Sequence, residues 1–124
     1  GDYNLHQQDA DRLAQALRQA QPGVLPEKLY VGAFPRVPSA TGEKTPAVNE
    51  ALNRRVQDGA LVVNYTGHGG TSGWAEEQIL TRADLSSWRN ADRMPFLVTA
   101  TCEFGRYDNP AEVSGAELAL LLPR

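Results

Sequence analysis

The chain has 124 residues, the size of one ordinary domain, and 41% of them are hydrophobic, so we expect residues 1–124 to be part of a single folded domain. Its formal net charge is −3 and its basic residues are scattered, which excludes the basic patch of a nucleic-acid-binding protein. No run approaches the roughly 20 apolar residues that cross a bilayer, so we predict no membrane-spanning segment in this sequence.

The first half of the chain predicts two helices separated by a strand. Residues 7–20 carry apolar side chains at helical spacing, and Pro22 and Gly23 follow, which predicts an amphipathic helix. Residues 28–34 are rich in Leu, Tyr and Val and predict a strand, which a proline-containing loop over 35–44 follows. A second helix is expected from Pro46 to Gly59, with Thr45 as its cap and a buried stripe of Val48, Ala51, Leu52 and Val56.

The second half predicts two buried strands and two helices. Residues 60–66 and 95–101 are nearly continuous apolar runs, as expected for strands covered on both faces. Between them, Thr81 and Asp84 have the spacing of a capping box, which predicts a short helix through Trp88. After the second strand, the residues from Asn109 to Glu112 predict the start of a last helix, over 111–121.

This alternation of strands and helices predicts an α/β fold, a parallel sheet flanked by helices on both sides. In such sheets, chemistry collects at the carboxyl ends of the strands. His68 and Cys102 each lie just past the end of a predicted strand. The 34 residues between them are enough for one helical crossover, so we expect the two side chains to meet if their strands are neighbours.

Cys102 is the single cysteine of the chain, so it has no internal disulfide partner and is either buried and inert or free and reactive. A nearby imidazole activates a thiol by stabilising the thiolate, which makes His68 the candidate base. The glycines beside His68 allow close approach of a substrate, so the backbone amides of Gly69 and Cys102 are candidate oxyanion donors. The alternative is that Cys102 is a small packed hydrophobe.

Three other side chains have a possible functional role beside a more common structural one. Trp74 follows the glycine loop and is a candidate for lining a substrate cleft, although a tryptophan there is more often part of the core. Glu103 follows Cys102 and is a candidate for shaping a pocket, although loop charges are more often solvated. His6 has no partner in view, which favours a surface or capping role. No paired ligand motif occurs, so we predict neither a metal nor a cofactor.

The segments around His68 and Cys102 resemble the His-Gly and Ala-x-Cys blocks of gingipain-type cysteine peptidases. These segments are Val62–Gly70 and Leu97–Phe104, and the similarity extends through Gly73–Glu76 and Arg106–Pro110. The resemblance implies a three-layer caspase-like fold, of which this chain would be a fragment. It also implies that Cys102 is the nucleophile, that His68 is base and then acid, and that the Gly69 and Cys102 amides bind the oxyanion. The acidic residue that orients the histidine in gingipains has no clear match.

Within this family the sequence is most similar to the surface sortases of the type IX secretion system of Bacteroidetes bacteria. That similarity implies cleavage of the C-terminal signal domains of secreted cargo proteins at the outer membrane surface. It also implies an amine of a surface glycolipid as acyl acceptor and other secretion-system components as partners. Two alternatives stay open: a plain gingipain-type endopeptidase, and a non-catalytic domain of a surface protein in which the thiol only packs.

Overall fold

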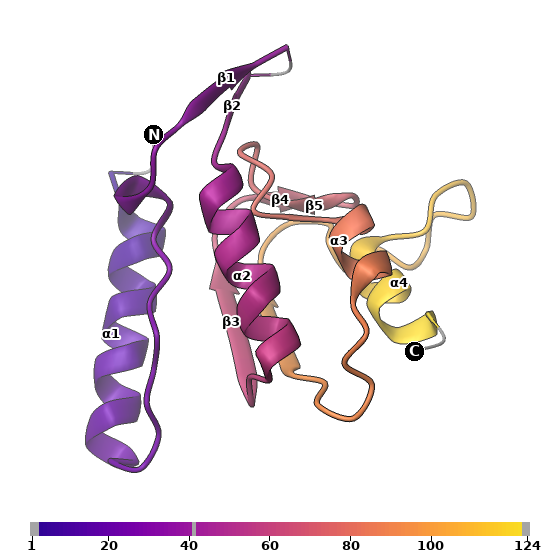
Figure 1. Ribbon diagram of the computed structural model, residues 1–124. Helices are drawn as coiled ribbons and strands as arrows, with labels where there is room; N and C mark the ends of the chain where they lie inside the picture. The colour runs from indigo at the N-terminus through magenta and orange to yellow at the C-terminus, as the bar shows by residue number, and fades with distance from the viewer. Residues whose placement is uncertain (1–2, 41, 123–124) are drawn as a thin grey trace.

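The computed structural model describes residues 3–40 and 42–122. Figure 1 shows the longer helices standing beside a short parallel sheet, with the small strands at one end of the sheet and the shorter helices to one side of it. In chain order the helices are α1 (Leu5–Ala20), the 3-10 turn η1 (Val31–Ala33), α2 (Pro46–Asp58), α3 (Arg82–Ser87) and α4 (Gly115–Leu121). The strands are β1 (Val37–Ser39), β2 (Gly42–Lys44), β3 (Val62–Thr66), β4 (Gly69–Gly70), β5 (Gly73–Trp74), β6 (Leu80–Thr81) and β7 (Phe96–Ala100).

Strands β3 and β7 form the central sheet, and they pair in parallel from Val62 opposite Phe96 to Thr66 opposite Ala100. Both predicted strands and their parallel pairing are therefore confirmed. In helix α2 the predicted stripe is present for Val48, Leu52 and Val56, which are each at most 7% exposed, whereas Ala51 is only partly buried. Partly buried side chains of the two strands, among them Val63 and Leu97, pack against the buried core that contains this stripe.

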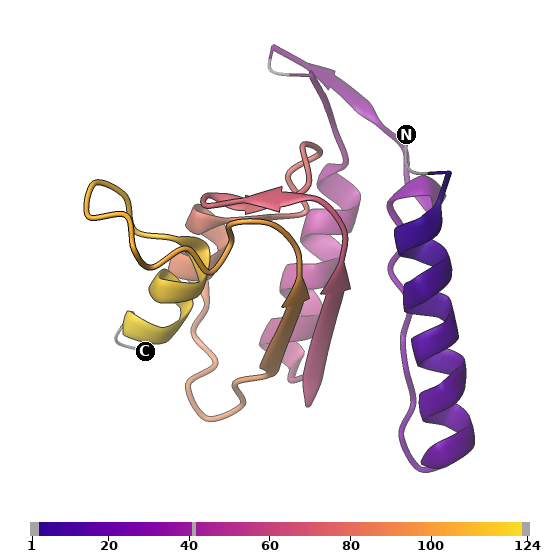
Figure 2. The same cartoon turned by 180° about the vertical axis from the view of Figure 1, so that it is seen from behind.

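The prediction that both strands are covered on both faces is wrong for the residues that the structure describes. Alternate side chains of β3 and β7 are exposed, with Val62 at 53%, Phe96 at 70% and Val98 at 39%. Figure 2 shows this face of the two strands from behind, with α1 standing beside the edge of β3 instead of across the face. The parallel sheet with helices is thus present, whereas the three-layer caspase-like arrangement is not seen within residues 3–40 and 42–122.

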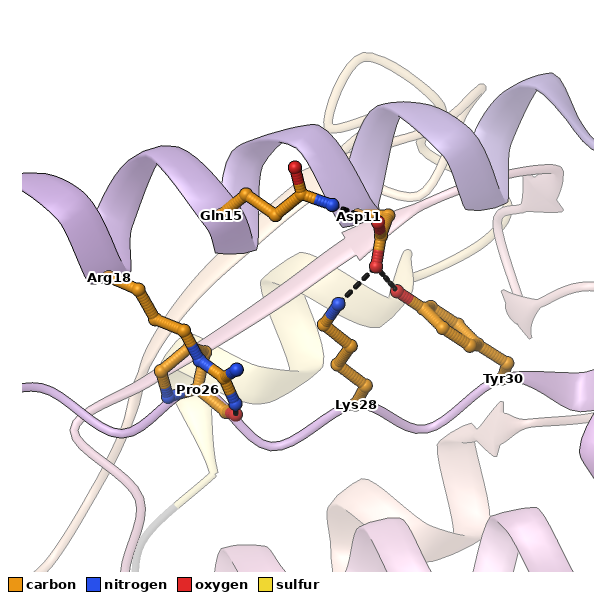
Figure 3. Close-up of polar contacts among 6 residues, drawn as sticks. All are labelled: Asp11, Gln15, Arg18, Pro26, Lys28 and Tyr30. Carbon is orange, nitrogen blue, oxygen red and sulfur yellow. Dashed lines mark hydrogen bonds and ion pairs between the residues drawn. The ribbon is translucent and has the colours of Figure 1, made fainter.

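Residues 28–34 do not form the predicted strand. Lys28 and Tyr30 instead direct their polar ends to Asp11 on α1, while Leu29 and Val31 pack against the core. The alternation that suggested a strand is real, but a strand needs a neighbour for its backbone hydrogen bonds. None of the described strands pairs with this segment. Figure 3 shows the resulting polar contacts between the segment and α1.

Short elements complete the fold at the carboxyl ends of β3 and β7. The predicted loop over 35–44 contains an antiparallel hairpin, β1 with β2, and the strands β4, β5 and β6 form a small antiparallel sheet. The Thr81–Asp84 capping box is present and starts α3, as predicted. Helix α4 starts later than predicted because Ser114 and Glu117 form its capping box. In the part of the chain described, no helix is both long and apolar enough to cross a membrane.

Candidate active site

His68 and Cys102 leave the central sheet at matching positions. The last paired residues are Thr66 and Ala100, a register offset of 34, and His68 and Cys102 are each two residues further along and are also separated by 34. The backbone amide of Gly67 still donates to the carbonyl oxygen of Ala100 at 3.2 Å, so the two chains remain together as they leave the strands. Both side chains are exposed. The predicted adjacency of their strands is confirmed.

Tyr65 supports the histidine loop, which is the link of residues 67–68 between β3 and β4, and it is not among the site residues predicted from the sequence. Its ring folds back beneath the loop, and its hydroxyl donates to the carbonyl oxygen of His68 at 2.6 Å. A Cβ atom on Gly67 would lie 2.5 Å from this hydroxyl, so glycine is needed where the ring passes. The sequence does show a tyrosine in an apolar strand two residues before a glycine. The contact of its hydroxyl with the carbonyl oxygen of His68, however, is visible only in the folded structure.

We expect the stability of the domain to fall as the pH rises from about 10 to about 12. Burial, with the negative charge of Glu77 as a smaller cause, raises the pKa of Tyr65 to about 12. A tyrosine in the unfolded chain ionises near pH 10. The stabilisation that the protonated Tyr65 gives the folded state is therefore fully present below pH 10 and is lost as the pH rises through the folded pKa. Thermal unfolding from pH 8 to 12 measures it.

The variant Tyr65→Phe should not show this added alkaline fall, and at neutral pH it should be less stable by about 0.5–1.5 kcal/mol because one hydrogen bond is lost. Tyr107→Phe is the matched control, because Tyr107 is 83% exposed and should leave the fall unchanged. An equally steep alkaline loss in Tyr65→Phe would contradict the assignment to this residue.

Trp74 is a core residue. It is 1% exposed, stacks on Tyr65 with ring centroids 4.5 Å apart, and meets Phe104 at 5.7 Å. A side chain enclosed in this way supports the loop from beneath and has no face left for a substrate. The structure therefore corrects the expectation that Trp74 lines a substrate cleft.

Gly69, the first residue of β4, lies against Thr101, the residue that precedes Cys102. A Cβ atom at this position would lie 2.4 Å from the hydroxyl of Thr101, the residue before Cys102, and 3.1 Å from the carbonyl oxygen of Gly73. Gly69 pairs with Trp74 of β5, and the amide of Ala75 donates to His68 O at 2.9 Å. This is the pattern of a non-hydrogen-bonded antiparallel pair, so the amide of Gly69 points away from β5.

The backbone turns tightly directly after Cys102, and this turn is strained. The amide of Phe104 donates to the carbonyl oxygen of Cys102 at 2.7 Å, and Glu103 between them has a positive φ of 55°, which is unusual for a residue with a side chain. Such strain is found where the surrounding structure over-determines the backbone, often at functional sites. The Glu103 carboxylate is exposed and pairs with Arg106 at 3.3 Å. Its role in substrate binding stays a prediction.

An open depression of about 690 Å³ begins at His68 and runs across the small sheet to α3. Its lining includes His68, Gly69, Gly70, Glu76 and Arg82. Among residues 3–40 and 42–122, no group of three or more His, Cys, Asp or Glu side chains is placed to hold a metal ion.

A thiol and an imidazole at one edge of a parallel sheet, with glycine amides beside them, are the parts of a cysteine peptidase site. The sequence model of peptidase family C25 matches residues 1–124, and the chain belongs to this family, the family of the gingipains. The prediction of a gingipain-type cysteine peptidase is thereby confirmed at the level of the family. Neither a curated protein nor a solved structure gives a significant match.

Proposed function

We propose that this chain belongs to the catalytic domain of a PorU-type sortase, a surface peptidase of the type IX secretion system that cleaves C-terminal signal domains from secreted cargo. Cys102 is the nucleophile and His68 is its base. The observation that supports these roles best is the matched position of the two residues past paired strand ends. The family assignment supports cysteine peptidase chemistry, and the sortase assignment depends on the sequence resemblance alone.

In the acylation step, His68 accepts the thiol proton and the Cys102 Sγ attacks the carbonyl carbon of the scissile peptide bond. The carbonyl oxygen becomes an oxyanion, which the amides of Gly69 and Cys102 stabilise. Collapse of this intermediate breaks the C–N bond, and the proton on His68 moves to the leaving nitrogen. The products are a thioester on Cys102 and a released C-terminal domain with a new amino terminus.

In the deacylation step, a second nucleophile attacks the thioester carbon, and His68 takes its proton and then returns a proton to the Cys102 sulfur. Water as nucleophile gives hydrolysis, whereas an amine of a surface glycolipid gives an amide and anchors the cargo. The acyl-enzyme is the same for both acceptors. We place this reaction at the bacterial outer membrane surface, together with other secretion-system components.

The catalytic assignment predicts that a tagged thiol electrophile labels Cys102 of the intact protein rapidly at neutral pH. His68→Ala should slow this labelling by about 10-fold or more, because the imidazole stabilises the reactive thiolate. Ser72→Ala is the matched control, since Ser72 is exposed and lines the same depression. Labelling is followed by intact mass, and equal rates in His68→Ala and the native protein would refute the pairing.

The sortase assignment is tested by the mass of the cargo's new C-terminus. Incubation of the intact protein with cargo and an amine acceptor should yield an amide-linked product besides the released signal domain. If every cargo end carries only a carboxylate, the protein is an endopeptidase and the PorU-type proposal fails.

A further inference from the structure

A second histidine touches the candidate base. His6 lies in the first turn of α1, and its ring is 5.0 Å from the ring of His68, centroid to centroid, with the planes at 89°. This is an edge-to-face contact between two aromatic rings. The sequence predicts only a surface or capping role for His6. It does not predict this contact, because the two residues are 62 positions apart along the chain.

No side chain of α1 is buried, and polar contacts join the helix to Lys28 and Tyr30. Asp11 accepts hydrogen bonds from the hydroxyl of Tyr30 at 2.9 Å and from Gln15 at 2.6 Å, and it forms an ion pair with Lys28. Figure 3 shows these side chains converging from the helix and from the neighbouring segment. Lys28 and Tyr30 hold the pKa of the Asp11 carboxyl below its ordinary value.

The segment that holds α1 is itself attached to the core. Leu29 and Val31 alternate with the residues that bind Asp11 and pack against the buried cluster. The helix also lies along the free edge of β3, the strand that leads to His68 (Figure 2). Helix α1, which carries His6, and strand β3, which leads to His68, are therefore both held in place by the fold, and this fixes the two histidines relative to each other.

We propose that His6 is a positioning residue for His68. This inference rests on the proposed function, in which the imidazole of His68 must present one ring nitrogen to Cys102. His68 is exposed in the short link between β3 and β4, and a reaction that requires one orientation of the imidazole is faster when that orientation is held. The edge of the His6 ring against His68 restricts this rotation, so that α1 is part of the active site.

The test compares labelling rates of Cys102 in the intact protein for native, His6→Ala, His6→Phe, His68→Ala and the double variant. His6→Ala should slow labelling by about 3- to 10-fold, the range expected for one aromatic ring contact. His6→Phe keeps a ring and should stay within about 2-fold of native. In the His68→Ala background, His6→Ala should add nothing, because a positioning residue acts only through the residue it positions.

Gln7→Ala is the matched control, since Gln7 is an exposed neighbour on the same helical turn. Thermal unfolding of each variant checks that the fold is retained. Native rates in His6→Ala, with His68→Ala slow, would overturn the positioning role and leave the proposed function standing. Slowing by His6→Ala that persists in the His68→Ala background, or a His6→Phe variant as slow as His6→Ala, would also overturn it. Native rates in His68→Ala would instead refute the catalytic assignment itself.

Discussion

Under the proposed function, replacing Gly69 by alanine is expected to lower kcat/KM for peptide cleavage by about 100-fold, because it forces the segments around His68 and Cys102 apart. The added Cβ would lie 2.4 Å from the hydroxyl and 3.3 Å from the methyl group of Thr101, and 3.1 Å from the backbone oxygen of Gly73. Rotation of the threonine cannot relieve all three contacts. The chain must shift at Gly69, at Thr101 or at both, and these residues adjoin His68 and Cys102.

Gly70→Ala is a close control for this substitution. It adds the same methyl group one residue further on, but nothing lies within 4 Å of the added Cβ. Its kcat/KM should stay within about 3-fold of native, and both variants should keep a cooperative thermal transition. If Gly69→Ala cleaves cargo as fast as Gly70→Ala, the close contact between the loops has no importance for catalysis and the oxyanion role of Gly69 loses its support.

The largest loss of stability is expected for Gly115→Ala. The added Cβ would lie 2.2 Å from one carbon of the Phe104 ring and 2.7 Å from another. The ring is 1% exposed and packs against Trp74, so it has no space into which to move. Overpacking of this kind costs about 1–3 kcal/mol and outweighs the advantage of alanine over glycine in a helix, about 1 kcal/mol.

The same substitution should also slow labelling of Cys102. The amide of Gly115 donates to the carbonyl oxygen of Thr71 at 2.7 Å, and the amide of Ala116 donates to Phe104 O at 3.0 Å. The start of α4 thus holds both the chain after His68 and the chain after Cys102. Chemical denaturation measures the change in unfolding free energy, and Gly105→Ala is the control, because its nearest neighbour would be 3.9 Å away. Equal unfolding free energies for the two variants would contradict this account.

The elements that were predicted correctly depend on local signals. The Thr81–Asp84 capping box and the proline at the start of α2 are hydrogen-bonding and steric features that few neighbouring residues determine. The apolar runs that became β3 and β7 are local in the same sense. The pairing of these two strands follows from topology rules for parallel sheets, which is why the meeting of the His68 and Cys102 strands was predictable.

The errors share a different cause. Whether residues 28–34 form a strand depends on a neighbouring strand, and whether Val62 and Phe96 are covered depends on which element lies over them. Neither neighbour is encoded in the segment itself. The start of α4 was also predicted wrongly. Two segments can start this helix, residues 109–112 and Ser114 with Glu117, and the second one forms both reciprocal hydrogen bonds of a capping box.

By itself the sequence determined the alternating elements, the family, and the identity of the candidate nucleophile and base, because periodicity, capping and short motifs are properties of consecutive residues. Only the tertiary structure decided that Trp74 is buried under the loop, that Gly69 touches Thr101 and that His6 meets His68. These are contacts between residues far apart in the chain, and side-chain burial and close packing exist only once the chain has folded.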